Sequence, residues 1–131
     1  MAHLLMIESW VGGTGRIFPP AIGRLGHRYT FVTRNRGHYL DARSREIHPV
    51  IEHAEHVLTT ETNDVPALIE FLRAQHAILK FDGVVTICDY YIDTVAQVAE
   101  TIVSRCPGTT IMATSREALR IDGEHVYRVT P

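Results

Sequence analysis

The sequence has only two cysteines, Cys88 and Cys106, among 131 residues, which excludes a disulfide-stapled secreted scaffold and a cysteine-rich metal domain. It also lacks an apolar run long enough to cross a bilayer. Basic charge is not in excess, since 13 Lys and Arg face 15 Asp and Glu, for a formal net charge of −2. Such a balance gives no general attraction to nucleic acid or to anionic membranes. We therefore expect a reduced, cytoplasmic protein with no nucleic-acid partner and no membrane partner.

The remaining composition is that of a globular domain. Hydrophobic residues make up 45% of the chain and charged residues 21%, so the chain can bury a core. A length of 131 residues suits one domain, which we place at residues 1–131. The apolar segment Met1–Trp10 has no basic stretch and carries Glu8, which favours a buried strand over a signal peptide.

Short β-branched and apolar runs alternate with helical patterns along the chain. The expected strands are His3–Glu8, Tyr29–Thr33, Val57–Thr59, Gly83–Ile87 and Thr109–Ala113, with a weaker edge strand at Glu124–Val129. The expected helices start with Pro19 and Pro20 in a first turn, with Asn63 or Asp64 as a cap, and with Asp89 or Asp93 as a cap. Residues 38–56 show no clear pattern.

This alternation predicts βαβ units and a parallel sheet. We expect an α/β fold, a three-layer Rossmann-like domain with a mainly parallel sheet in the order 3-2-1-4-5 plus the weak edge strand. Ligands of such sheets bind beyond the carboxyl ends of the strands, where the strand order reverses. The predicted site therefore lies between the first and fourth strands, bordered by the loops Gly12–Arg16 and Cys88–Tyr91.

The glycine-rich loop is the first candidate. Glycines let backbone amides approach an anion, and the start of the following helix favours negative charge. The loop lacks the Gly-Lys-Ser/Thr end of a Walker A motif, and Phe18 holds the third glycine position of a dinucleotide fingerprint. The alternative is a tight turn without a ligand. The predicted ligand-binding residues are Gly12, Gly13, Thr14, Gly15 and Arg16.

Arg34 and Asp89 are predicted to flank the same ligand. An arginine suits a phosphate or a carboxylate, and Arg34 follows the second strand together with Arg36. The alternatives are a solvated basic turn for the arginines and a helix cap for Asp89. His53 and His56 are three residues apart, but no further ligand set accompanies them, so we expect no metal site. No catalytic residue is predicted.

Three segments together resemble the N-terminal, pre-ATP-grasp domain of ATP-grasp carboxylate–amine ligases over about residues 1–100. They are LLMIESWVGGTGR, YTFVTRNRGHYL and FDGVVTICDYYIDTVAQVAE. The resemblance implies a Rossmann-like domain that helps to hold the acceptor substrate. It implies ATP and magnesium only for a full-length parent, whose later domains bind them, and no cofactor for this domain on its own.

Residues 99–131 resemble a different family, the P-loop NTPase modules of AfsR/LuxR-type bacterial transcriptional regulators. The segment AETIVSRCPGTTIMATSREALRIDGEHVYRVTP carries this resemblance, with Thr114–Glu117 in the sensor position. No phosphate-binding loop precedes it. The two resemblances meet inside the helix Ile92–Arg105, which suggests a chimera of pre-ATP-grasp material (1–98) and NTPase-like material (99–131) completing one sheet.

Three functions follow. The first is an isolated small-anion or nucleotide-binding or scaffold domain derived from an ATP-grasp ligase, without turnover alone. The second is a fragment of a complete ATP-dependent carboxylate–amine ligase. The third is a regulatory interaction domain related to the transcriptional regulators, although the chain has no basic helix-turn-helix. The weak edge strand also predicts self-association into a homo-oligomer.

Overall fold

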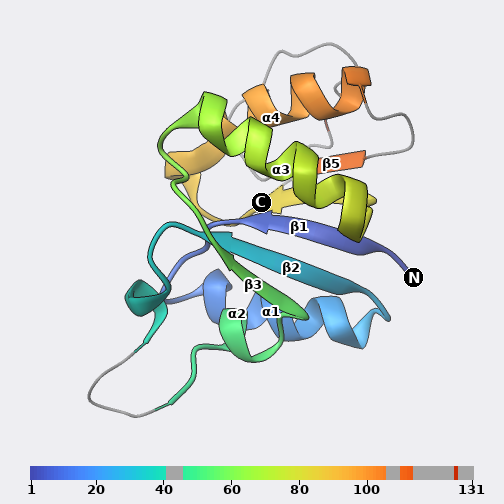
Figure 1. The fold of residues 1–131 in the computed structure, drawn as a ribbon. Helices are drawn as coiled ribbons and strands as arrows, with labels where there is room; N and C mark the ends of the chain where they lie inside the picture. The colour runs from blue at the N-terminus through green and yellow to red at the C-terminus, as the bar shows by residue number, and fades with distance from the viewer. Residues whose placement is uncertain (41–45, 106–109, 114–125, 127–131) are drawn as a thin grey trace.

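The chain folds into a five-stranded parallel sheet, seen in a computed structural model that describes residues 1–40, 46–105, 110–113 and 126 (Figure 1). Each strand pairs in parallel with its neighbours, in the order β3-β2-β1-β4-β5. The predicted α/β class and the predicted strand order are confirmed. The strands are β1 (His3–Ile7), β2 (Arg28–Thr33), β3 (His56–Thr59), β4 (Gly83–Thr86) and β5 (Thr110–Ala113).

The central strands are buried on both faces, as their unbroken apolar runs predict. Leu5 and Ile7 of β1 point to one face, whereas Met6 between them points to the other. Strand β1 lies between β2 and β4, with Met6 opposite Phe31 and Val85. The predicted edge strand Glu124–Val129 lies outside the described residues except for Val126, which is exposed.

Helices cover both faces of the sheet and make the three layers visible in Figure 1. On one face, Leu68 and Leu72 pack with Val95 and Val98 against the sheet. On the other face, Ile22, Val50 and Ile51 pack against Met6, Phe31 and Val85. The helices are α1 (Thr14–Arg24), α2 (Pro49–Glu52), α3 (Val65–Leu79) and α4 (Ile92–Arg105), and two 3-10 turns are η1 (Arg36–Tyr39) and η2 (Asp89–Tyr91).

The predicted start of the first helix is wrong. Pro19 and Pro20 were expected in the first turn, but α1 already begins at Thr14 and holds both prolines in its interior. The Gly15 and Arg16 amides donate 3.0 Å hydrogen bonds to the carbonyls of Gly12 and Gly13. The glycine loop thus closes into a helical turn at once, and the helix forgoes the two amide hydrogen bonds that the prolines cannot donate.

The described residues between 38 and 55, which the sequence left unassigned, form short local structures. Leu40 and Ile47 pair in an isolated antiparallel bridge, and residues 41–45 between them are outside the described part. The short helix α2 follows, with His48 as its cap: the His48 Nδ1 accepts a hydrogen bond from the Val50 amide. Pro49 occupies the first helical position, where no amide donor is needed.

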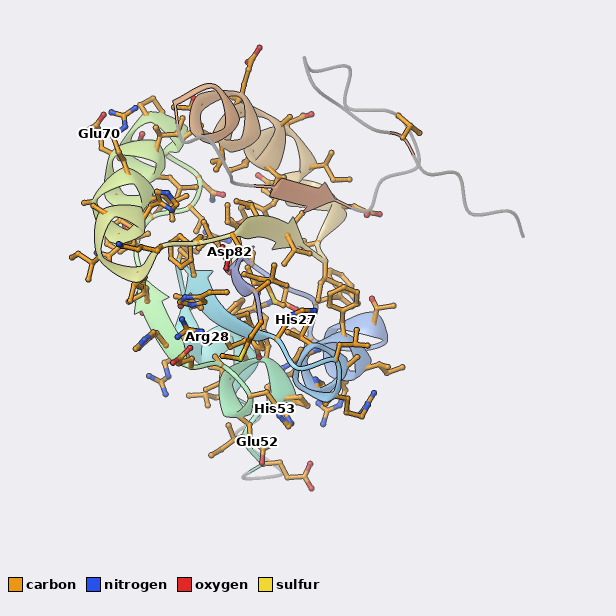
Figure 2. All side chains as sticks on the ribbon, turned by 90° about the vertical axis from the view of Figure 1, so that its right-hand side faces the viewer. His27, Arg28, Glu52, His53, Glu70 and Asp82 are labelled. Atoms are coloured by element: carbon orange, nitrogen blue, oxygen red, sulfur yellow. The ribbon has the colours of Figure 1, made fainter. Side chains whose placement is uncertain are left out.

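Polar contacts tie the amino ends of the strands together on the side that faces the viewer in Figure 2. The Asp82 carboxylate accepts from the His3 amide at 2.8 Å, and His27 Nδ1 accepts from the Ala2 amide at 3.0 Å. Arg28 forms an exposed ion pair with Glu55 at 2.7 Å. The polar groups at the amino ends of these strands are therefore bonded to one another. Among the described helices, none has the length and apolar character required to cross a membrane.

Candidate functional site

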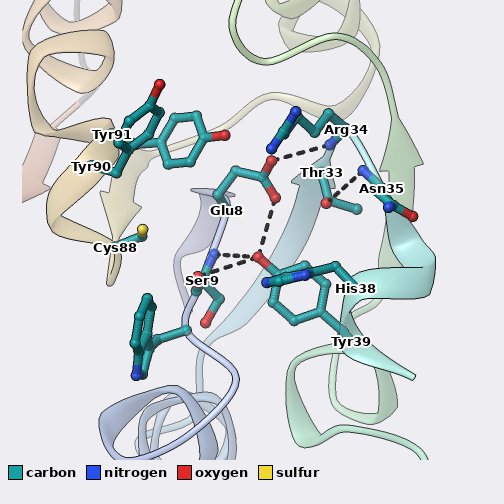
Figure 3. Close-up of a pocket in the computed structure, with 11 residues that line it drawn as sticks. Glu8, Ser9, Thr33, Arg34, Asn35, His38, Tyr39, Cys88, Tyr90 and Tyr91 are labelled. Carbon is teal, nitrogen blue, oxygen red and sulfur yellow. Dashed lines mark hydrogen bonds between the residues drawn. The ribbon is translucent and has the colours of Figure 1, made fainter. Parts of the chain in front are cut away.

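A cavity of about 320 Å³ opens at the opposite edge, beyond the carboxyl ends of β1, β2 and β4 (Figure 3). Because the three strands are parallel, the segments that follow them meet there. The side chains that line the cavity come from all three segments. They are Glu8, Ser9 and Trp10 after β1; Thr33 at the end of β2, with Arg34, Asn35, His38 and Tyr39 after it; and Cys88, Tyr90 and Tyr91 after β4.

Glu8 lies at the centre of the hydrogen bonds around this cavity. Its side chain is only 3% exposed, and its φ of 54° is rare for a residue with a side chain. One carboxylate oxygen accepts from the Arg34 amide and the Thr62 hydroxyl, and the other accepts from the Tyr39 hydroxyl. Such donors compensate the burial of a carboxylate. An uncommon backbone conformation of this kind is often found at functional sites.

Tyr39 closes one wall of the cavity. Its hydroxyl accepts a 3.0 Å hydrogen bond from the Ser9 amide and lies 3.2 Å from both Glu8 Oε1 and the Ser9 carbonyl oxygen. Burial raises the pKa of Tyr39 strongly, and the nearby Glu8 carboxylate raises it further. Tyr39 therefore stays protonated and serves as a fixed hydrogen-bond donor rather than as a base.

The Ser9 hydroxyl is buried without a partner. Ser9 is 4% exposed, and its Oγ is the buried side-chain polar atom without a hydrogen-bond partner in the described residues. An unsatisfied buried hydroxyl costs free energy, and a bound ligand or water can satisfy it. Ser9 lines the cavity, and its buried Oγ is left without a partner beside it.

Arg34 supplies positive charge to the cavity. Its amide is held by Glu8, while its exposed side chain lies near the Tyr91 hydroxyl. Burial raises the pKa of Tyr91, and hydrogen bonding to Thr62 and the Arg34 charge oppose that rise. The Tyr91 hydroxyl is also 3.1 Å from the Asn63 side-chain oxygen, to which it donates. The lining thus combines one cationic side chain with one buried carboxylate.

The predicted glycine loop lies beside this cavity but does not line it. Gly15 is buried because the chain approaches itself closely, and an added Cβ would lie 1.7 Å from the Trp10 carbonyl oxygen. Gly13, at φ 49°, caps α1 without a side-chain hydrogen bond. With the Gly15 and Arg16 amides bonded inside the loop, its backbone acts as a tight turn, and its binding role stays a prediction.

A second cavity of about 410 Å³ adjoins the first and shares His38 and Tyr39 with it. Arg16 lines this second cavity, together with the buried His48. His48 Nε2 lies 2.8 Å from the Val11 carbonyl oxygen, so His48 links α2 to the loop after β1. Of the seven predicted ligand-binding residues, Arg34 thus lines the first cavity and Arg16 the second.

Asp89 lies in η2 and is exposed, and it does not line either cavity. The cap of η2 is Cys88, whose backbone adopts an extended conformation. The sequence predicts Asp89 or Asp93 as the cap of the next helix. This prediction is wrong, because α4 begins at Ile92, with Asp89 in η2 before it and Asp93 inside its first turn. That Asp89 binds a ligand stays a prediction.

The histidines do not gather into a metal site in the described part of the chain. There, no three His, Cys, Asp or Glu side chains are grouped as ligands. His53 follows α2 and contacts Glu52 at 3.9 Å, whereas His56 begins β3; both are exposed.

Sequence reasoning missed most of the cavity. Glu8 and Ser9 were assigned to a strand end, and Tyr39 lay in the segment without a pattern. One signal was present, because a charged residue at the end of a fully apolar strand must be paired or exposed. The positive φ of Glu8 and the long-range contact with Thr62 have no signature in the sequence.

Known proteins support the same fold. A sequence profile described as the ATP-grasp N-terminal domain matches residues 21–102. The structure resembles an L-amino acid ligase from Bacillus licheniformis, with a TM-score of 0.60 and 19% identity over 79% of this chain and 23% of that one. It also resembles a glycinamide-RNase-transformylase T from Mycobacterium tuberculosis, with a TM-score of 0.56 and 16% identity over 83% of this chain and 28% of that one.

The chain spans about a quarter of the length of these two structures. No curated protein sequence matches it significantly. The profile match covers more than half of the chain and extends four residues past the suggested junction at residue 98. The resemblance of residues 99–131 to NTPase modules gains no support, and Thr114–Glu117 lies outside the described residues. The chain belongs to the ATP-grasp N-terminal domain family.

Proposed function

We propose that this chain is the substrate-holding domain of an ATP-dependent carboxylate–amine ligase, and that it binds a small anionic molecule without turnover of its own. The observation that carries the proposal is the cavity at the carboxyl ends of β1, β2 and β4, with Arg34 and the unpartnered Ser9 hydroxyl in its lining. A guanidinium and a buried hydroxyl together suit a carboxylate or a phosphate.

An amino acid is the preferred ligand among small anions. One similar structure is named an L-amino acid ligase, and that name describes the other protein. In this cavity, the exposed Arg34 side chain carries the positive charge that suits a carboxylate, whereas Glu8 is already bonded to three donors. In a complete ligase, the domain would hold and orient the substrate while other domains activate it.

ATP and magnesium are proposed only for such a complete ligase. At the start of α1, the Gly15 and Arg16 amides are bonded to loop carbonyls, and the first turn of α1 holds no acidic residue. No step is therefore assigned to ATP or magnesium within this chain. A cytoplasmic location, the chimeric origin and self-association through a sheet edge also stay predictions.

Calorimetric titration tests the proposal. Wild-type protein is titrated with a panel of amino acids and separately with ATP, beside the variants Arg34→Gln and Arg24→Gln. Arg24 is exposed at the far end of α1 and serves as the matched control. We expect binding of an amino acid that weakens about tenfold in Arg34→Gln, as for a lost charged hydrogen bond, and not in Arg24→Gln. No heat with any ligand would leave only a scaffold role.

A further inference from the structure

The cavity concentrates the amphipathic aromatic residues of the chain. The sequence holds one tryptophan and five tyrosines, and four of these six residues line this one cavity: Trp10, Tyr39, Tyr90 and Tyr91. Tyrosine and tryptophan present a broad apolar face together with a polar group, and they are enriched where ligands and partners bind. Their concentration here points to more than a site for a bare anion.

Two of these rings are engaged at their polar ends. The Tyr39 hydroxyl is held by Ser9 and Glu8, and the Tyr91 hydroxyl by Asn63 and Thr62. These hydrogen bonds fix both rings in place. A ring that is already fixed loses little conformational entropy when a ligand packs against it.

The other two rings are largely exposed at the cavity. Trp10 is 59% exposed and Tyr90 is 76% exposed. They reach the cavity from different strands, Trp10 after β1 and Tyr90 after β4. The Tyr90 ring packs edge-on against Tyr91, with ring centroids 5.1 Å apart. Large exposed aromatic surfaces at a cavity are available to a ligand that carries apolar area.

The polar groups of the same cavity define the other half of the ligand. Arg34 offers a guanidinium, and the Ser9 hydroxyl is buried and unpartnered. We propose that the ligand is a small carboxylic acid that carries a planar ring, with its carboxylate at Arg34 and its ring against Trp10 or Tyr90. This inference rests on the proposed function and narrows its ligand class.

Two carboxylates separate the contribution of the ring to the binding affinity from that of the carboxylate. 3-Phenylpropionate carries the ring and the carboxylate, whereas propionate carries the carboxylate alone. Trp10 is the only tryptophan of the chain, so fluorescence excited at the red edge of the absorption, where tyrosine does not absorb, reports on this one side chain. We expect 3-phenylpropionate to bind about three- to tenfold more tightly than propionate, as for one aromatic contact, and to change the Trp10 emission.

Matched variants assign the gain to the rings. Trp10→Leu and Tyr90→Leu keep an apolar side chain but remove the ring, and calorimetry replaces fluorescence for the first of them. We expect the double variant to bind both acids with the affinity that wild type has for propionate. Leu25 is an exposed apolar residue at the carboxyl end of α1. Leu25→Ala should therefore change the affinity for neither acid.

The outcomes are distinct. If both acids bind equally and Arg34→Gln weakens both, the proposed function stands and the ring inference is wrong. If 3-phenylpropionate keeps its advantage in the double variant, the exposed rings serve another purpose, such as contact with a protein partner, and the inference is again wrong. If neither acid binds and Arg34→Gln changes nothing, the proposed anion-binding function itself fails.

Discussion

The Glu8 carboxylate accepts a 2.8 Å hydrogen bond from the Thr62 hydroxyl, although 54 residues separate the two in the chain. Both side chains are buried, so the contact fixes the segment before α3 to the end of β1. We expect Thr62→Val to lower the free energy of unfolding by about 1–3 kcal/mol, because a hydrogen bond to a buried charged group is lost. Urea denaturation measures the change.

Thr59→Val is the matched control for this variant. Thr59 is exposed at the end of β3, where the same replacement removes no buried hydrogen bond. Its effect should stay within about 0.5 kcal/mol. Equal effects of the two variants would show that the Glu8–Thr62 contact does not stabilise the fold.

Gly15 should not tolerate a side chain. An alanine Cβ there would lie 1.7 Å from the Trp10 carbonyl oxygen, which is backbone and cannot move without shifting β1 or α1. We expect Gly15→Ala to destabilise the protein by about 3 kcal/mol. Gly23→Ala in the same helix has open space around the new Cβ, and we expect it to stabilise by about 0.5–1 kcal/mol. Thermal unfolding measures both changes. Equal changes in the unfolding temperature of the two variants would refute this explanation.

Lys80 ends α3 in the left-handed conformation, with φ 54°. Glycine adopts this conformation without strain from a Cβ, whereas alanine and lysine do not. We expect Lys80→Gly to raise the free energy of unfolding by about 0.5–1 kcal/mol. Lys80→Ala, which keeps the Cβ, should give no such gain. A gain of the same size in both variants would point to the loss of the lysine charge instead.

His48 should make stability depend on pH. Burial lowers the pKa of His48, although its hydrogen bond to the Val11 carbonyl opposes this effect. Because His48 Nδ1 accepts from the Val50 amide, the proton of the neutral ring belongs on Nε2, which then donates to Val11. Protonation of Nδ1 would therefore break the cap of α2. The native state therefore binds this proton less readily than the unfolded chain does.

The sign follows from that difference. The contribution of His48 is complete above the ordinary histidine pKa of about 6.5, and it is lost as the pH falls from there through the lower native pKa. We expect His48→Gln to flatten the fall in unfolding free energy between about pH 7 and pH 5. His53→Gln, at an exposed position, is the matched control. Burial also lowers the pKa of His3, so His3 maintains part of the pH dependence of stability in both variants.

The strand order followed from the sequence because it depends on a few strong patterns. Apolar runs such as Gly83–Ile87, separated by helical segments, permit only a small set of parallel arrangements. The sequence also predicts Asn63 or Asp64 as the cap of α3, and the structure selects Asp64, whose carboxylate accepts from the Ala67 amide at 3.2 Å. These features are local, and their physical cause lies within a few residues.

The lining of the cavity could not be read in the same way. Tyr39 reaches Glu8 and Ser9 only because η1 turns the chain back over the end of β1. The sequence placed Arg34 near the site, since Arg34 directly follows β2. It could not show that the Gly15 and Arg16 amides of the glycine loop are hydrogen-bonded to carbonyl groups of the loop itself. Contacts between segments far apart in the chain depend on the assembled fold.

Most of the side chains around the cavity belong to connecting segments, whereas the sheet is held by residues such as Leu5 and Val84 inside the layers. Exchanging Trp10 or Tyr90, which are exposed, therefore leaves the packing between helices and strands intact. Ligand preference can diverge among descendants of this scaffold by a handful of replacements in its loops. Glu8 is the exception. Its carboxylate connects the segment after β1 to the segments after β2 and β3, and its loss would remove the hydrogen bonds that hold them together.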